Sequence, residues 1–320
     1  MNYGLPYRGS KNTIAEWVVS HFPKREHFYD LFCGGCAITH AAMLAEKFST
    51  YTINDVLDTP RLFLDAIGGK YRDERRWISR EDFQRLKDTD PYVKTCWSFG
   101  NDGRSYLYAK EIEPWKKALH YARVLGDLSL LEAFGIKGDG SRLDIKRNAP
   151  EYREKYINWY KKAFHASQGF KRLESLQSLE SLQSLESLQR LERLQRLERL
   201  QSLERLQRLE LFRGDYQNVK IKPNSLIYCD IPYRGTDGYS KAGFDHERFY
   251  SWAERQTEPV IISEYEMPAG RFICMDGIEK LCTLDANNNS LKKKERLFIP
   301  RTQEKLFMQK KTQWKQLELF

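Results

Sequence analysis

The sequence predicts an α/β fold in which a Rossmann-like, doubly wound sheet is assembled from both ends of the chain. Near the amino end, a short buried strand leads through a glycine turn into a helix and then a second strand. Near the other end, apolar segments of strand length alternate with a helical segment after a long interruption. Strand, glycine turn, helix and strand in this order are typical of a doubly wound sheet.

The amino-terminal part of the sheet is expected between residues 5 and 64. This stretch contains both the apolar spacing of a helix and the short apolar runs of buried strands. The expected elements are a helix with an apolar face at Trp17, Val18, Val19 and Phe22, a strand over 28–32, a helix over 37–47 and a strand over 51–54.

The carboxyl-terminal part of the sheet is expected from residue 211 onward. Its expected elements are a buried strand over 226–229, a helix over 247–255, a second strand over 260–263 and a late edge strand over 296–299. Residues 1–76 and 211–320 are therefore predicted to form one discontinuous domain.

Between these two parts the composition changes. Residues 77–170 are rich in Lys, Arg, Tyr and Trp at helical spacing, which predicts a separate helical lobe. A glycine-rich stretch over 135–140 should form an exposed loop within this lobe. The whole chain carries a formal charge of +9 with a pI near 9.1, which favours a polyanionic partner.

Residues 171–210 form a low-complexity insertion in which leucine occupies every third position from 173 to 209. The residue types favour helix. However, a three-residue step turns an α-helix by about 300°, so the leucines would not keep to one face. A 3₁₀-helix or a compact solenoid of short turns would align them. We expect a helical insertion that acts as a spacer or as an arm for self-association.

Composition also excludes two classes of protein. No apolar run approaches the ~20 residues of a membrane-spanning helix, so a cytoplasmic protein without a membrane partner is expected. Six scattered cysteines are too few for a disulfide scaffold. Cys33 and Cys36 form a single Cys-x-x-Cys pair, which either packs beside a ligand or carries metal or redox chemistry. We expect packing, because no second pair or nearby histidine completes a zinc site.

The first motif that carries chemistry is Phe-Tyr-Asp-Leu-Phe-Cys-Gly-Gly over residues 28–35. Glycine lets the backbone approach a nucleotide-like cofactor closely, although a plain tight turn also explains these glycines. The full Gly-x-Gly-x-x-Gly pattern is absent, so a cofactor without phosphates is favoured over a dinucleotide. Asp55 closes the second strand about 20 residues further on, where an acid commonly holds ribose hydroxyls.

The second motif is Ile-Tyr-Cys-Asp-Ile-Pro-Tyr over residues 227–233. Here an apolar strand delivers an acid, a rigid proline and an aromatic ring to a loop at the carboxyl end of the strand. Ligands of open α/β sheets bind at this edge. The motif is the most informative stretch of the chain.

Together these residues resemble the Dam-like family of DNA adenine methyltransferases, whose catalytic motif reads Asp-Pro-Pro-Tyr. The family's aromatic-x-Gly-Gly-Lys segment is similar to Tyr-Arg-Gly-Ser-Lys at 7–11, and its Phe-x-Gly-x-Gly cofactor loop to Phe-Cys-Gly-Gly at 32–35. The resemblance covers roughly residues 3–66 and 211–265. Two positions depart from the family pattern, because Ile231 replaces the first proline and Ser10 replaces a glycine.

The resemblance implies a Rossmann-like methyltransferase sheet with an inserted helical DNA-recognition lobe. It also implies methyl transfer from S-adenosylmethionine to the exocyclic amine of adenine in double-stranded DNA, by base flipping and without a metal. Asp230 and the carbonyl of Ile231 would hold the amine, Pro232 would stiffen the loop and Tyr233 would stack on the base. The implied cofactor residues are Tyr7, Lys11, Asp30, Phe32, Cys33, Gly34, Gly35, Asp55 and Asp230.

Several alternatives stay open at this point. Tyr7 and Lys11 also suit the capped start of a helix. The candidate DNA contacts of the lobe are Arg104, Tyr106, Lys110, Lys137 and Arg142, but aromatic residues at helical spacing also suit a core. The same chemistry on RNA or on a protein amide, and a non-catalytic nucleic-acid-binding or self-associating protein, are the two alternative functions.

Overall fold

The computed structural model describes residues 3–132, 209–234, 243–282 and 291–307, apart from 6, 8, 72, 102, 111 and 128. The chain forms two compact units. The first consists of Met1–Leu5, Gly9–Gly68 and Leu200–Phe320, and the second of Pro6–Arg8 and Gly69–Arg199. The sequence alone places the boundaries of the α/β domain at 76 and 211. The leucine repeat and the glycine-rich loop at 135–140 lie outside the described residues.

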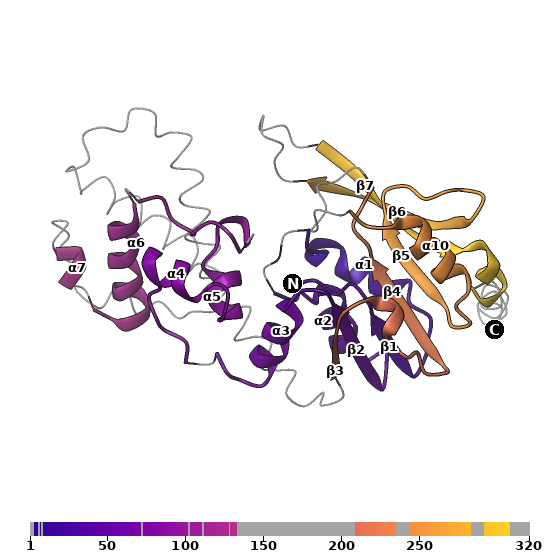
Figure 1. Ribbon diagram of the computed structural model, residues 1–320, viewed down its shortest axis with the longest axis horizontal. Coiled ribbons are helices and arrows are strands. Elements are labelled where there is room, and N and C mark those ends of the chain that lie inside the picture. Colours follow the sequence, from indigo (N-terminus) through magenta and orange to yellow (C-terminus); the bar gives the residue numbers. More distant parts are fainter. Residues whose placement is uncertain are drawn as a thin grey trace, which may run out of the picture. The chain divides into compact units, whose positions relative to one another are not determined.

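The first unit contains one mixed sheet of seven strands, so the predicted α/β fold is confirmed. The strands, labelled in Figure 1, are hydrogen-bonded in the order β3-β2-β1-β4-β5-β7-β6. Neighbours from β3 to β5 are parallel, whereas β7 is antiparallel to both β5 and β6. The strands are β1 (His27–Asp30), β2 (Thr50–Asp55), β3 (Leu209–Arg213), β4 (Ser225–Asp230), β5 (Val260–Glu264), β6 (Phe272–Cys282) and β7 (Leu291–Pro300).

One strand prediction is wrong in its position. The stretch 296–299 was expected to be an edge strand, but it belongs to β7, which lies between β5 and β6. Leu297, Phe298 and Ile299 are all buried, as expected for an inner strand that is covered on both faces. The edge strand at this end of the sheet is β6, whose mixture of polar and apolar residues hides it from a search for apolar runs.

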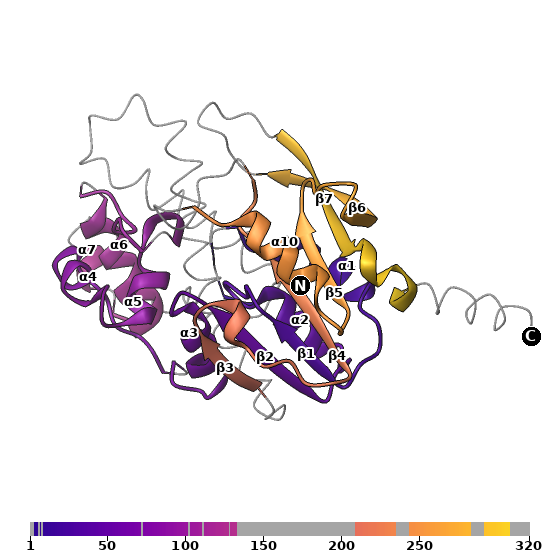
Figure 2. The same ribbon diagram turned by 45° about the vertical axis from the view of Figure 1, so that its right-hand side comes forward.

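Helices cover both faces of this sheet. The helical elements of the first unit are η1 (Asn12–Ile14), α1 (Ala15–Ser20), α2 (Ala37–Leu44), α3 (Thr59–Ile67), η6 (Tyr216–Asn218), α10 (His246–Glu254) and η7 (Arg301–Gln303). On the face of α1 and α2, Phe28 of β1 and Tyr228 of β4 pack against Phe22. On the opposite face, α10 covers β1, β4 and β5, as Figure 2 shows.

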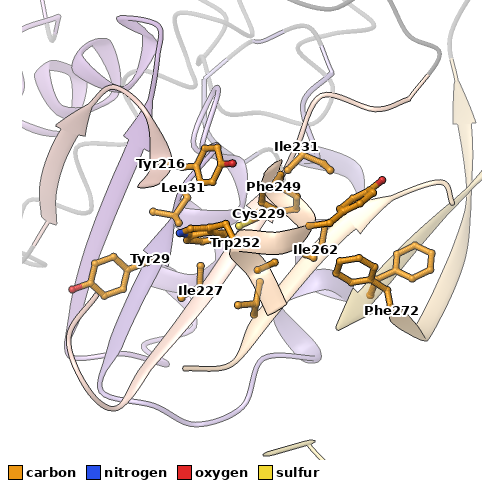
Figure 3. Packing of buried hydrophobic residues seen from close by; sticks show 14 of the residues in the cluster. Tyr29, Leu31, Tyr216, Ile227, Cys229, Ile231, Phe249, Trp252, Ile262 and Phe272 are labelled. Carbon is orange, nitrogen blue, oxygen red and sulfur yellow. The ribbon is translucent and has the colours of Figure 1, made fainter. Parts of the chain in front are cut away.

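The core beneath α10 contains mainly aromatic and branched aliphatic side chains. Phe249 and Trp252 of α10 pack over Ile227 of β4, Ile262 of β5 and Leu31, which directly follows β1 (Figure 3). Burying each such side chain stabilises the fold by about 1.5–3 kcal/mol. This rigid layer fixes the ends of β1, β4 and β5 relative to one another.

The described part of the second unit is helical. Its elements are α4 (Arg80–Leu86), α5 (Pro91–Cys96), η2 (Phe99–Asn101), α6 (Glu113–His120), the π-helical turn η3 (Tyr121–Leu125) and α7 (Ser129–Glu132). Ser79 and Asp90 cap α4 and α5 by accepting hydrogen bonds from backbone amides. Trp77 stacks on Tyr108 and meets Trp97 edge-on, so aromatic rings form its core. Throughout the described residues, every helix is too short or too polar to cross a membrane.

Candidate active site

Four parallel strands end in acidic residues at the same edge of the sheet. Asp30 ends β1, Asp55 ends β2, Asp230 ends β4 and Glu264 ends β5. These strands are direct neighbours in the order β2-β1-β4-β5. Because parallel strands present their carboxyl ends at one edge, the fold gathers the four carboxylates where ligands of such sheets bind.

The loop between β1 and α2 is tied to the end of β2. The Cys33 amide donates to the Asn54 carbonyl at 3.1 Å, and the Gly34 amide donates to the Asp55 carboxylate at 2.9 Å. Gly34 (φ 47°) and Cys36 (φ 58°) both adopt left-handed backbone conformations. The second is unusual for a residue with a side chain. The loop thus turns sharply and keeps its backbone beside Asp55.

The amino-terminal segment packs directly on this loop. The Leu5 amide donates to the Gly35 carbonyl at 2.7 Å, and the Gly4 amide donates to Nδ1 of His40 at 2.8 Å. A Cβ atom on Gly4 would lie 2.4 Å from the Gly35 oxygen and 2.6 Å from the Ala37 nitrogen. Burial lowers the pKa of His40 to about 4, so its ring is neutral and accepts this hydrogen bond. Only glycine fits at position 4.

Asp30 is the deepest of the four acids at this edge. It is 1% exposed, and its Oδ2 accepts a hydrogen bond of 2.7 Å from the Thr39 hydroxyl of α2. Its Oδ1 has no hydrogen-bond partner among the described residues. Burial raises the pKa of Asp30 to about 7, and the negative charges of Asp230 and Asp55 add to this effect. A positively charged ligand would satisfy the buried oxygen.

Asp55 faces the same loop from the end of β2. Its two carboxylate oxygens accept the Gly34 amide at 2.9 Å and the Leu57 amide at 3.0 Å. Burial raises its pKa, and these hydrogen bonds oppose the rise. Each carboxylate oxygen has more than one lone pair, so Asp55 has further acceptor capacity.

The loop after β4 is held by side chains from two other elements. The ring of His246, at the start of α10, donates from Nε2 to the Pro232 carbonyl at 2.9 Å. The Arg234 amide donates to Glu264 at 3.2 Å. Ile231 is 1% exposed and belongs to the core beneath α10 (Figure 3). The isoleucine that departs from the family motif is therefore accounted for by packing.

A partly buried ion pair joins this loop to Lys11, which precedes η1. Nζ of Lys11 lies 2.7 Å from Oδ1 of Asp230 and 4.0 Å from Oε1 of Glu295, which lies on β7. The same ammonium lies 4.6 Å from the ring centroid of Tyr233. The Tyr233 hydroxyl donates to Glu295, and the ring meets Tyr265 edge-on at 4.6 Å. Lys11, Asp230, Tyr233 and Glu295 thus form one network.

Negative charge dominates this edge. Burial raises the pKa of Glu264 to about 7, and Asp230 and Glu295 contribute further repulsion. Burial also raises the pKa of Tyr233 well above its usual value, so the phenol is neutral and donates its proton to a hydrogen bond. The only lysine or arginine among the buried residues of the first unit that the structure describes is Lys11. A cationic ligand suits such a site.

The sequence profile of the D12 class N6 adenine-specific DNA methyltransferase family matches residues 7–260. The chain belongs to this family. It is therefore an enzyme that methylates adenine in DNA, and the resemblance inferred from the motifs is confirmed. A search of curated proteins finds no match to the chain.

The remaining predicted cofactor residues of the methyltransferase are placed as follows. Phe32 is half-buried, and its ring packs on Tyr216 at 5.1 Å, on the α10 face. Tyr7 is half-buried and belongs to the Pro6–Arg8 segment of the second unit. Burial raises the pKa of the Cys33 and Cys36 thiols, which keeps them protonated. The described residues contain no group of three or more side chains suited to a metal ion.

The predicted DNA contacts of the methyltransferase divide into three groups. Arg104 and Lys110 are exposed. Tyr106 is buried, and its hydroxyl donates to the Ile78 carbonyl at 2.6 Å, which favours the core alternative for this residue. Lys137 and Arg142 lie outside the described residues.

Sequence reasoning missed three residues of this site. Glu264 directly follows an apolar strand, and the rule that selects Asp55 would also have selected it. His246 lies directly before the helix predicted over 247–255, and nothing in the sequence indicates its contact with the Pro232 carbonyl. Glu295 follows Lys292, Lys293 and Lys294, so the sequence suggests a solvated, charged edge.

Proposed function

We propose that the protein transfers a methyl group from S-adenosylmethionine to the exocyclic amine of a flipped adenine in duplex DNA. The observation that carries this proposal is the pairing of two features at one sheet edge. One is a glycine loop with an unsatisfied buried acid, Asp30, and the other is the Asp230-Ile231-Pro232-Tyr233 loop, which ends the neighbouring strand. The family adds the target base, adenine in DNA.

The residues of the first unit fit the cofactor. When bound, S-adenosylmethionine supplies a methyl group activated by a positively charged sulfur. The buried Oδ1 of Asp30 is an acceptor for a cationic group, and Asp55 has acceptor capacity for ribose hydroxyls. The backbone of Gly34 and Gly35 presents no side chain between these two acids.

Asp230 and Ile231 would hold the target amine. The amine of adenine is a poor nucleophile, because its lone pair is delocalised into the ring. Two acceptors, the Asp230 carboxylate and the Ile231 carbonyl, favour a tetrahedral nitrogen whose lone pair points away from them. Orientation of this nitrogen in a site without bulk water would be the main source of rate.

Tyr233 would stack on the base after it has left the duplex. Enzymes that act on a base inside the stack extrude it into a pocket and hold it against aromatic side chains. His246 and Glu264 would keep the loop in place, because they fix the Pro232 carbonyl and the Arg234 amide. We propose that the second unit contacts the DNA through exposed cations such as Arg104 and Lys110.

Incubation with labelled S-adenosylmethionine and genomic DNA that lacks N6-methyladenine tests the proposal. Nucleoside analysis should find the label in N6-methyladenine. Label in cytosine, or only in RNA or protein, would refute the proposed target. Sequencing of the modified positions then gives the recognition sequence.

Asp230→Asn tests the catalytic assignment. We expect methyl transfer to fall by on the order of 100-fold, since one preorganised polar contact at the reacting atom contributes about that much. Cofactor binding by calorimetry should be largely kept. Asp58→Asn is the matched control, because Asp58 is exposed and pairs with Arg213 on the surface of the same unit. An Asp230→Asn variant as active as this control would remove Asp230 from the mechanism.

A further inference from the structure

Glu295 is a buried acid in a strand whose pairing and packing do not require a charged side chain. It is 1% exposed, and Leu297, Phe298 and Ile299, which follow Arg296 in β7, are buried and apolar. The pairing of β7 with β5 and β6 uses backbone groups. Burying a carboxylate costs several kcal/mol unless it is paired. An apolar side chain would serve the sheet better, so the reason for this acid must lie in its contacts.

Two contacts of Glu295 are with the network around Asp230. Its Oε1 accepts the hydrogen bond of the Tyr233 hydroxyl and lies 4.0 Å from Nζ of Lys11. The hydroxyl bond sets the tilt of the Tyr233 ring, which Tyr265 contacts edge-on. Lys11 therefore lies between two carboxylates, closer to Asp230 at 2.7 Å than to Glu295.

The position of Lys11 conflicts with the target amine. Its ammonium donates to Asp230 and lies over the ring of Tyr233. These are the two side chains that the proposed function assigns to the target base. When the base enters, Lys11 has to give up part of its contact with Asp230. A buried ammonium without a counter-ion is costly.

Glu295 is placed to compensate this loss. A charge-assisted hydrogen bond is about 2.7–2.9 Å long, so Lys11 would have to approach Glu295 by only about 1 Å. Glu264, another buried acid of this edge, already accepts hydrogen bonds from the backbone amides of Tyr265 and Arg234. Lys11 and Glu295 are both at least nine-tenths buried, so an ion pair between them would be shielded from solvent.

We propose that Glu295 is a positioning residue of the methyl transfer. It fixes the ring of Tyr233 through the phenolic hydroxyl, and it takes over Lys11 when the target amine binds Asp230. The inference rests on the proposed function. It adds a residue on an antiparallel strand to a site that is otherwise built from loops and parallel strands.

Glu295→Gln is the first test, because glutamine keeps the size of the side chain and removes its charge. We expect kcat to fall at least tenfold, equivalent to about 1.4 kcal/mol. The Kd for S-adenosylmethionine should stay within about twofold, which also shows that the variant is folded. Glu279→Gln is the matched control, since it makes the same change at an exposed position of the neighbouring strand β6.

Base binding should change together with kcat. A duplex with 2-aminopurine at the mapped target position becomes more fluorescent when the base leaves the stack. We expect a smaller rise in fluorescence with Glu295→Gln than with Glu279→Gln. Equal rises and equal kcat values for the two variants would overturn the inference.

A double-mutant cycle separates positioning from a general structural effect. Tyr233→Phe keeps the ring and removes the hydroxyl that donates to Glu295. If Glu295 acts through this hydroxyl, the loss in the double variant will be clearly smaller than the product of the two single losses. Independent, multiplicative losses would contradict the assignment.

Failure of the inference and failure of the proposed function are distinguishable. If the wild-type protein does not methylate adenine in DNA, the proposed function fails. If it does and Glu295→Gln behaves like Glu279→Gln, only the role of Glu295 fails.

Discussion

Replacement of Asp30 by asparagine should make the protein more stable at pH 8 and less able to bind its cofactor. Burial raises the pKa of Asp30 from 3.8 to about 7. The folded protein thus holds a proton on this group over a pH range in which the unfolded chain has released it. Because the folded state binds this proton more tightly, the free energy of unfolding depends on pH. The contribution of Asp30 to it is fully present below about pH 4 and is lost as the pH rises through about 7.

The size of the effect follows from the two pKa values. A difference of about three pH units corresponds to about 4 kcal/mol, an upper limit because the environment relaxes around a buried charge. Asparagine mimics the protonated acid and can still accept the hydrogen bond from Thr39. We expect Asp30→Asn to gain about 2 kcal/mol at pH 8, which raises Tm by roughly 4–8 °C. Near pH 4 the gain should vanish.

The affinity for the cofactor should rise with pH, whereas the stability of the protein falls. If ionised Asp30 accepts the cationic group, affinity for S-adenosylmethionine will increase up to tenfold per pH unit below about 7 and level off above it. Calorimetry in buffers of different ionisation enthalpy should detect proton release near pH 6.5. The Asn variant should bind weakly at every pH.

The control for Asp30→Asn is Glu254→Gln in the same unit. A hydrogen bond from Arg271 lowers the pKa of Glu254, so its removal should destabilise the protein at neutral pH. The reasoning about Asp30 is refuted if Asp30→Asn is no more stable than the wild type at pH 8. It is equally refuted if the wild type binds its cofactor with the same affinity at pH 5.5 and pH 8.

Two further predictions concern the scaffold of the site. Gly4→Ala places a Cβ 2.4 Å from the Gly35 oxygen at a left-handed φ of 65°. It should therefore lower the free energy of unfolding by at least about 2 kcal/mol and weaken cofactor binding, as denaturation and calorimetry would show. Gly270→Ala, with open space around it, should change neither quantity. Ile231→Ala should cost about 2–5 kcal/mol in urea denaturation, whereas Ile231→Val should cost about 0.5–1.5 kcal/mol, because the side chain is 1% exposed within the core beneath α10. Equal losses for the two Ile231 variants would contradict this packing.

Four of the five parallel strands were predictable because each of them is a short apolar run that ends in a turn or an acid. The runs at 28–32, 51–54, 226–229 and 260–263 all correspond to observed strands. The strand β3 was missed, because its residues Leu209–Arg213 continue the leucine spacing of the repeat. The strand β6 was missed because it mixes polar and apolar residues and therefore contains no continuous apolar run. Such a mixture suits an antiparallel edge strand that remains in contact with water.

The acids of the site also divide into those that the sequence predicts and those that it does not. Asp30, Asp55 and Asp230 were found because parallel strands bring their carboxyl ends to one edge, so each acid can be placed from its own short segment. Glu295 required the register of an antiparallel pair. Its neighbour Arg296 lies opposite Glu264, so the middle of β7 meets the carboxyl end of β5. A search for acids at the ends of strands therefore misses it, although it lies at the same edge as the others. Its pairing with Tyr233 and its distance from Lys11 follow from the direction of one strand, a property that no single segment of the sequence contains.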